Sequence, residues 1–284
     1  MTRPDEFSSQ DRVALLDLIA RIEEADGVRP VNESAELIIN GYRDGEVVLE
    51  PAGGAPVAFG IADPREETIM LGVDPLHRRQ GHGSNILRKL LQSQPQSSVW
   101  SFGSLPSAQE LASSMGLKPV RRLLEMGRDL KDEPAPIVPD GYRITAFEDR
   151  DAEPVVAVNA VAFAHHPEQG KLTVAEFVDL TKQPWFTADG LLVARRGDEV
   201  AGFHWTKRHD EETGEVYVLA VDPAHSGGGL GRALLESGLA HLEQIGCTKV
   251  ILYVEADQER VVRLYQSANF ETINVDTNYR PEEA

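Results

Sequence analysis

A loop with four glycines in five positions is the part of this sequence best suited to chemistry. It reads DPAHSGGGLG, spans residues 222–231, and lies between an apolar segment and one with helical spacing. Glycine lets successive backbone N–H groups point inward without obstruction by side chains, and the positive end of the helix that follows adds to their field. We therefore expect this loop to bind a pyrophosphate group.

Two other kinds of glycine loop do not match. A P-loop requires GxxxxGK[ST], and no Lys-Ser or Lys-Thr pair follows these glycines. A dinucleotide fingerprint, GxGxxG or GxGxxA, that starts at Gly229 would place Leu234 where the third small residue belongs. The sequence excludes both classes of nucleotide site.

The loop occurs twice. LGVDPLHRRQGHGSNIL, from Leu71, aligns with LAVDPAHSGGGLGRALL, from Leu219, at a constant offset of 148 residues. Weaker likenesses extend the repeat: PVAFGIA pairs with EVAGFHW upstream, and ELASSMGL pairs with RLYQSANF downstream. Self-similarity over most of each half predicts two copies of one fold.

The elements that must position the loop can be read from the periodicity around its second copy. LLVARRG, EVAGFHWTK and EVYVLAV alternate as antiparallel strands do, and LGRALLESGLAHLEQIG has helical spacing. KVILYVE is a continuous apolar run, typical of a strand covered on both faces, and a helix that Asp257 can cap and that ends at Asn269 follows it. The fold class is therefore α/β, with an α+β mixed and partly parallel sheet.

A proline-rich stretch separates the two copies. KDEPAPIVPDG, residues 131–141, has three prolines and no hydrophobic periodicity, which is typical of a short stiff connector. We place the boundary near Pro136, which predicts an N-terminal domain of residues 1–135 and a C-terminal domain of residues 136–284.

Composition limits the partners and the compartment. The chain has 28 basic and 46 acidic side chains, for a net charge of −18, so its field repels nucleic acid and anionic membranes. It has neither an apolar leader nor a run of about 20 apolar residues. We expect a cytoplasmic, soluble monomer with a small-molecule partner.

Cysteine and histidine give no sign of a metal or redox site. The single cysteine, Cys247, excludes an intrachain disulfide and a CxxC motif, and we expect it in the core. His204 and His209 are five residues apart in a polar segment without further ligands, so we expect no metal there.

The glycine loop matches the (Q/R)xxGxG/A signature of the GCN5-related N-acetyltransferases, or GNAT enzymes, which grip the pyrophosphate of coenzyme A. The signature positions hold Arg78, Gly81 and Gly83 in the first copy, and Ser226, Gly229 and Gly231 in the second. The second loop follows a strand ending in VDP and precedes LYVEADQERVVRLYQSANF, which is similar to the family's strand, helix and LYxxxGF ending. The resemblance implies two tandem GNAT domains and acetyl-CoA as co-substrate.

The chain resembles the mycothiol synthase family more closely, through HPEQG, FHWTK, GEVYVLAVDP, LYVEADQ and VDTNY. Members of that family acetylate the cysteinyl amine of desacetylmycothiol, a conjugate of cysteine, glucosamine and inositol, and give mycothiol and coenzyme A. The resemblance covers nearly the whole chain, and is densest from His165 to Tyr279. It implies an enzyme that needs no metal.

The resemblance also implies which residues bind. The coenzyme residues are Leu71, Gly72, Val73, Arg79, Gln80, Gly81, His82, Gly83 and Ser84 in the first copy, and Leu219, Ala220, Val221, Ser226, Gly227, Gly228, Gly229, Leu230, Gly231, Arg232, Gln258, Glu259, Arg260, Val261, Val262 and Arg263 in the second. The substrate residues are Glu33, Glu168, Lys207, Glu215 and Tyr253. The chain departs from the family pattern at Ser226, at Gly228, where arginine is frequent, and at Asn269, which replaces a glycine.

Two residues are candidates for the proton transfers. An α-amine with a pKa of about 8 is largely protonated at pH 7, and Glu215 can accept that proton, directly or through a water. The resemblance implies that Tyr265 protonates the departing thiolate. The alternatives are a solubilising glutamate on an edge strand and a tyrosine that packs on the sheet. In the first copy Glu67 aligns with Glu215 but Ala112 aligns with Tyr265, so we expect that copy to be non-catalytic.

Two other functions remain open at this point. One is an acetyltransferase that acts on a protein N-terminus or an antibiotic amine, and the other is a non-enzymatic regulator that holds acyl-CoA. Lys207 and Glu168 could equally be surface charges, although their flanks, FHWTK and FAHHPEQG, contain aromatic and histidine residues that suit a cleft.

Overall fold

The computed structural model describes residues 7–164 and 169–282, which form two compact units. The first unit takes its residues from 7–124, 255–257 and 274–282, and the second from 125–254 and 258–273. Three strands, β5 (Leu117–Asp129), β10 (Lys249–Glu255) and β11 (Glu271–Pro281), supply residues to both units. The units are therefore interleaved along the chain.

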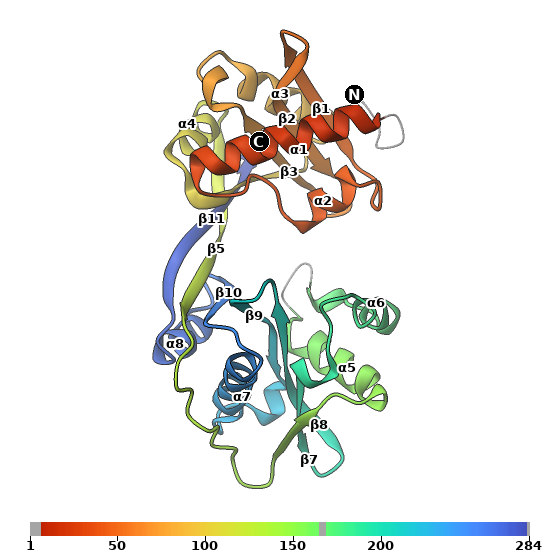
Figure 1. Cartoon of the computed structure of the whole chain (residues 1–284), viewed down its shortest axis with the longest axis vertical. Helices are drawn as coiled ribbons and strands as arrows, with labels where there is room; N and C mark the ends of the chain where they lie inside the picture. Colours follow the sequence, from red (N-terminus) through yellow and green to blue (C-terminus); the bar gives the residue numbers. More distant parts are fainter. Residues whose placement is uncertain (1–6, 165–168, 283–284) are drawn as a thin grey trace. The chain divides into compact units, whose positions relative to one another are not determined.

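The first unit is a mixed sheet with helices on both faces (Figure 1). Its other elements are α1 (Ser9–Asp26), α2 (Glu33–Ile39), β1 (Glu46–Ala52), β2 (Ala55–Asp63), β3 (Thr68–Val73), α3 (His82–Ser93), β4 (Ser98–Ser101) and α4 (Pro106–Ser114). Strands β1 to β3 are antiparallel, β4 is parallel to β3, and β11 is antiparallel to β4.

The period-2 pattern of the strands places one core on each face of this sheet. Val47 and Phe59 face α1 and α2, whereas the adjacent Val48 and Ala58 face α3. Helix α1 is capped by the Ser8 side chain at its start and by a left-handed glycine at its end, and its apolar stripe packs into the first core.

The second unit repeats this plan. Its elements are β6 (Arg143–Ala146), α5 (Ala152–Ala162), α6 (Val174–Leu180), β7 (Leu191–Arg196), β8 (Glu199–Arg208), β9 (Thr213–Val221), α7 (Leu230–Gln244), β10 (Lys249–Glu255) and α8 (Glu259–Ser267). Strands β6 to β9 are antiparallel and β10 is parallel to β9. Helices α5 and α6 contact one face, and α7 contacts the other.

The predicted order of strands, helix, strand and helix is confirmed. The prediction that Asp257 caps the last helix is wrong: the N-cap position of α8 is Gln258, and its side chain makes no capping hydrogen bond. Asn269 adopts the left-handed conformation, with φ at 64°, just after α8 ends, as its amide side chain allows. The stretch 131–141 contains no helix or strand, and the boundary at Pro136 stays a prediction.

Strand β9 is irregular at its centre. Trp205 pairs with Val218 but Thr206 pairs with Val216, so Tyr217 is one extra residue and β9 bulges there. Strands β9 and β10 pair only as far as Glu215 within the described chain, so one edge of β9 beyond it has no strand partner.

The same opening occurs in the first unit, where β3 and β4 pair only at Thr68↔Ser98 and Ile69↔Val99. In both units the strand with the open edge leads directly into a glycine loop.

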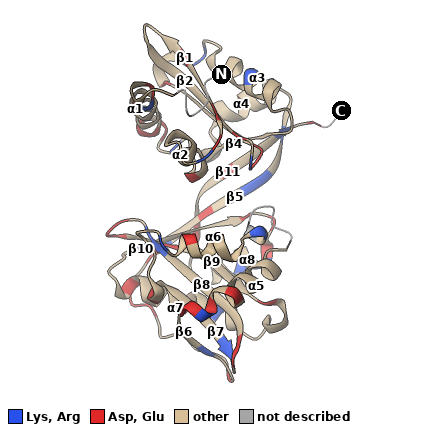
Figure 2. Ribbon diagram, turned by 90° about the vertical axis from the view of Figure 1, so that its right-hand side faces the viewer, with Lys and Arg blue, Asp and Glu red and all other residues tan. Residues whose placement is uncertain are grey.

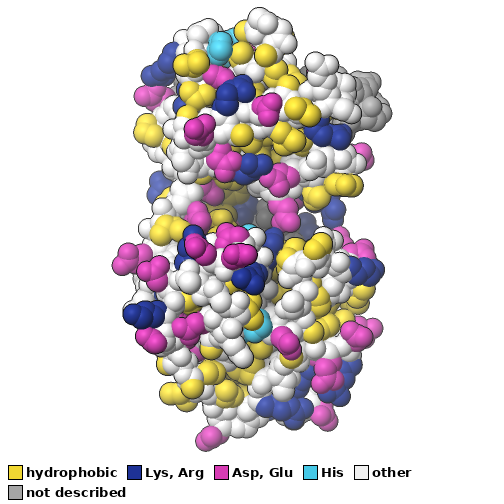
Figure 3. Space-filling view, viewed as in Figure 1, with side chains coloured by type: hydrophobic (Ala, Val, Ile, Leu, Met, Phe, Trp, Pro, Cys, Tyr) yellow, Lys and Arg dark blue, Asp and Glu magenta, His cyan; other side chains and the backbone are white. Residues whose placement is uncertain are grey.

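Charged side chains are spread over both units. Acidic and basic residues are scattered along the ribbon (Figure 2), and no large field of one sign covers the face of either unit in Figure 3. Within the described residues, no helix combines the length and the apolar character that crossing a bilayer requires.

Candidate functional site

The second glycine loop folds into a cradle of backbone N–H groups. Asp222 caps a short 3₁₀ turn at Pro223–His225, and Gly227 and Gly229 then take φ values of 90° and 88°. Helix α7 starts at Leu230 with no side-chain cap, so the first N–H groups of the helix lack a capping partner. This is the local geometry that binds a phosphate oxygen.

The first loop has the same backbone. Asp74 caps the 3₁₀ turn at Pro75–His77, Arg79 and Gly81 have φ values of 61° and 88°, and α3 starts without a side-chain cap. Arg79 is thus held in the left-handed region where the second copy has Gly227, at a cost of roughly 1–2 kcal/mol.

The side chains around the first loop are already engaged. Arg78 donates two 2.8 Å hydrogen bonds to the carboxylate of Asp26 and one of 3.1 Å to the Val73 carbonyl. His82, at the start of α3, lies 3.2 Å from a carboxylate oxygen of Glu50. The signature arginine therefore points at α1, and two carboxylates lie close to the loop.

The second loop carries fewer of these contacts. The Ser226 hydroxyl donates to the Pro223 carbonyl at 2.9 Å, so it closes its own turn. Arg232 donates to Glu236 and to Ser267, and thereby ties the start of α7 to the end of α8. The usual long side chain of the signature is thus absent, and the Ser226 hydroxyl is engaged within its own turn.

A second cluster, of side chains from β8 and β9 and their neighbours, lies beside the bulge in β9. Lys207 on β8 and Glu215 on β9 are cross-strand partners, so their side chains share a face of the sheet. The Glu215 carboxylate is 9% exposed, and its Oε2 lies 2.7 Å from Nε2 of His209. The Lys207 ammonium lies 4.9 Å from the centre of the Trp185 ring and 5.1 Å from that of Tyr217. Predicted base and predicted substrate residue are thus brought together.

Three residues of this cluster were missed from the sequence. The sequence suggested His209 only as a possible metal ligand. It lies six residues before Glu215, on the other side of a hairpin turn, and this spacing can bring the two side chains together. Tyr217 gave no signal because the bulge that turns its ring is a tertiary feature. Trp185 lies in the segment between α6 and β7, where nothing local connects it with Lys207.

His204 and His209 face different partners. His204 is fully buried against α7, where its Nδ1 donates to the Leu234 carbonyl at 2.8 Å, and burial lowers its pKa to about 4. Among the described residues no group of three or more His, Cys, Asp or Glu side chains is arranged to hold a metal ion. Cys247 is buried, and burial raises the pKa of its thiol.

Tyr265 lies on α8 in the same unit as Glu215. Its ring packs edge-on against Phe270, with centroids 5.7 Å apart, and its hydroxyl makes no hydrogen bond to the described residues. Burial raises the pKa of this phenol, so it stays protonated at neutral pH.

The remaining predicted residues lie on other elements. Glu33 is the first residue of α2, in the first unit, and Tyr253 is a half-exposed residue of β10. Glu168 lies outside the described residues. Residues 258–263 form the N-cap and first turn of α8, where Arg263 pairs with Glu259 at 3.0 Å on the surface.

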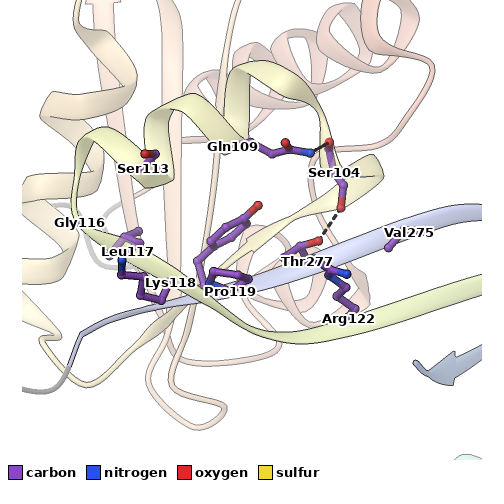
Figure 4. Close-up of a pocket in the computed structure, with 11 residues that line it drawn as sticks. Ser104, Gln109, Ser113, Gly116, Leu117, Lys118, Pro119, Arg122, Val275 and Thr277 are labelled. Carbon is purple, nitrogen blue, oxygen red and sulfur yellow. Dashed lines mark hydrogen bonds between the residues drawn. The ribbon is translucent and has the colours of Figure 1, made fainter. Parts of the chain in front are cut away.

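A separate pocket lies in the first unit, among α4, β5 and β11 (Figure 4). Its volume is about 480 Å³, and Lys118, Arg122 and several hydroxyl groups line it. None of the described residues predicted for binding or catalysis takes part in this lining.

The chain is similar to known acetyltransferases. Residues 160–270 match the model of the Acetyltransferase (GNAT) family. A mycothiol acetyltransferase of Propionibacterium freudenreichii is 42% identical over 97% of this chain and 90% of its own length. One from Catenulispora acidiphila is 40% identical over 98% of this chain and 96% of its own.

Solved structures support the same fold. A GCN5-related N-acetyltransferase from Sphaerobacter thermophilus aligns with a TM-score of 0.77, at 24% identity, over 95% of this chain and 92% of its own. A tandem GNAT protein from the clavulanic acid biosynthesis pathway aligns with a TM-score of 0.71, at 18% identity, over 96% and 94%. The predicted tandem GNAT fold is confirmed.

Proposed function

Because the chain belongs to the mycothiol acetyltransferase family, we propose that it moves the acetyl group of acetyl-CoA to the cysteinyl amine of desacetylmycothiol. The products are mycothiol and coenzyme A. The observation that carries the proposal is the likeness to these enzymes over nearly the whole length of both chains, 97% and 90% for the Propionibacterium relative.

The second unit offers a continuous path for the coenzyme. GNAT acetyltransferases use acetyl-CoA, and the open edge of β9 leads into the glycine loop and α7. In this proposal Leu219 and Val221 bind the pantetheine arm through their backbone groups, and residues 226–232 bind the pyrophosphate. Residues 258–263, at the start of α8, contact the rest of the coenzyme.

Glu215 acts as the general base. The substrate amine has a pKa of about 8 and enters mainly as an ammonium ion, which cannot attack a thioester. A carboxylate that is 9% exposed and lies beside the open edge of β9 can take that proton. Tyr265, which stays protonated because burial raises its pKa, supplies a proton to the departing thiolate.

Lys207 binds the hydroxyl-rich part of the substrate. The Trp185 and Tyr217 rings hold its ammonium by cation–π contacts, so it is pre-oriented on the same sheet face as Glu215. Glu33, Glu168 and Tyr253 complete the proposed substrate set.

The N-terminal half, residues 1–135, is non-catalytic in this proposal, and chemistry is confined to residues 136–284. Two features support the division. The first copy has Ala112 where the second has Tyr265, and its signature arginine is held by Asp26 and the Val73 carbonyl.

Glu215→Gln tests the assignment of the base. Purified protein is incubated with acetyl-CoA and desacetylmycothiol, and coenzyme A release and product mass are followed. We expect the variant to lose about 10²–10⁴-fold in kcat, the usual contribution of a general base, while its affinity for acetyl-CoA is unchanged. The matched control is Glu212→Gln, at an exposed glutamate of the same hairpin.

Each outcome has a meaning. No acetylation of desacetylmycothiol by the unaltered protein, with turnover of another amine from a small panel, would overturn the substrate assignment. An active Glu215→Gln variant would overturn the role of the base.

A further inference from the structure

The contact between His209 and Glu215 joins a buried carboxylate to solvent. Glu215 is 9% exposed and the His209 side chain is 37% exposed, with 2.7 Å between Nε2 and Oε2. The imidazole therefore has one edge on the carboxylate and another part of its surface in water.

The hairpin between β8 and β9 fixes His209 in this position. Its backbone N–H donates to the Thr213 carbonyl at 2.9 Å, and Arg208 donates to the carbonyls of Asp210 and Glu211. The Asp210 carboxylate accepts from the N–H groups of Glu212 and Thr213, which lowers the pKa of Asp210. These hydrogen bonds hold the backbone of the turn, and none of them involves the His209 ring.

The corresponding hairpin of the first unit lacks this arrangement. Its loop, residues 64–67, reads PREE and contains no histidine. The histidine–carboxylate pair is therefore present only at the hairpin of the unit that also contains Tyr265.

The proposed reaction makes such a pair useful. An ammonium ion and acetyl-CoA give an amide, coenzyme A thiol and one free proton, so each turnover must deliver one proton to solvent. Glu215 accepts a proton from the ammonium ion, but its burial keeps it from bulk water. Imidazole can accept a proton on one nitrogen and release another from the second nitrogen.

We propose that His209 is a positioning residue and proton relay for Glu215, which rests on the proposed function. The N–H bond of the ammonium breaks as an O–H bond forms on Glu215. That proton passes to Nε2 of His209, which accepts it in the tautomer that carries its proton on Nδ1, as the Nδ1 proton leaves for water. Exchange of the ring protons with water then restores the starting tautomer. The second proton of the amine passes to solvent when the tetrahedral intermediate collapses, and the Tyr265 phenolate regains from solvent the proton that it gave to the coenzyme A thiolate.

Other titratable groups surround the pair. Lys207 lies on the same face from β8, Tyr217 from β9, Arg208 and Asp210 lie in the hairpin, and Cys247 precedes β10. These groups set the electrostatic background, so the test compares variants at His209 that leave all of them in place.

Three variants separate a relay from a passive hydrogen bond. His209→Ala removes both functions, whereas His209→Gln keeps an N–H that can donate to Glu215 but cannot pass a proton. His77→Ala is the matched control, because His77 is 35% exposed and lies 3.4 Å from a carboxylate oxygen of Asp74, in the first unit. For each protein, kcat and KM are measured for both substrates from pH 6 to pH 10, with and without added imidazole.

We expect both His209 variants to lose about tenfold or more in kcat near pH 7, with KM for acetyl-CoA unchanged, since proton-transfer groups contribute about 10²–10⁴-fold. The loss in kcat becomes smaller above a pH of about 8, where the amine is already neutral. Added imidazole restores the kcat of the His209→Ala variant. His77→Ala behaves as the unaltered protein.

Full activity of His209→Ala, or of His209→Gln, would overturn the relay while leaving the proposed function intact. No turnover of desacetylmycothiol by the unaltered protein would overturn both, so the two failures are distinguishable.

Discussion

The phenol of Tyr265 illustrates how a single buried group can be tested without disturbing the fold. Its ring packs on Phe270 and its hydroxyl makes no hydrogen bond to the described residues, so Tyr265→Phe removes only the proton donor. We expect kcat to fall about 10²-fold with unchanged thermal stability. Steady-state kinetics and thermal unfolding check this, and an undiminished kcat would show that the tyrosine only packs.

His204 predicts a dependence of stability on pH. Burial lowers its pKa from 6.5 to about 4, so between these values the unfolded chain binds a proton that the folded chain does not. The stabilisation is complete above pH 6.5 and is lost as the pH falls toward 4, and His241, whose pKa burial also lowers, acts in the same direction.

We expect protonation of His204 in the unfolded chain to lower the free energy of unfolding by about 2 kcal/mol between pH 7 and pH 5. Urea titrations of the unaltered protein and of His204→Gln at both pH values isolate the contribution of His204 to this decrease. An equal decrease in both proteins would contradict it.

At the scale of elements, helix α7 contacts its sheet through glycine. A Cβ on Gly238 would lie 2.1 Å from the His204 ring, whereas one on Gly231 would meet only Val221, at 3.6 Å. Gly238→Ala should therefore destabilise the protein by about 1–3 kcal/mol, through overpacking. Gly231→Ala, in the same helix, should be neutral or stabilising by up to about 1 kcal/mol. Urea unfolding of both variants checks the pair, and equal stabilities would contradict the steric account.

The elements were largely predictable because their signals are local. Alternation marks β7 to β9, and helical spacing marks α7. Its glycines predicted the second loop and the repeat predicted the first, which has matching φ values at Arg79 and Gly81. The clustering of Lys207 with Glu215 could be anticipated only from motifs, and the bulge at Tyr217 could not, because it depends on how two strands pair.

At the scale of the whole molecule, the interleaving of the units left no trace in the sequence. Residues 274–282 belong to the first unit, where Thr277 pairs with Ser101 and Asn278 donates to Ser98. These pairs join residues more than 170 positions apart, and neither periodicity nor composition encodes such a partner.

Separating the chain at Pro136 tests this organisation. A fragment of residues 1–135 lacks the strand that pairs with β4, so we expect it to unfold without a sharp transition. Adding a peptide of residues 271–282 should restore cooperative unfolding, as followed by circular dichroism. A fragment that unfolds cooperatively without the peptide would contradict the expectation.

Strand β11 also fixes the order in which this protein can be completed during synthesis. The edge of β4 that β11 covers leaves the ribosome well before its partner, which follows roughly 10–30 s later at ordinary rates of translation. Until then the N-terminal unit carries an exposed strand edge that could pair with another nascent chain. The last strand made is thus the one that protects the first unit from aggregation.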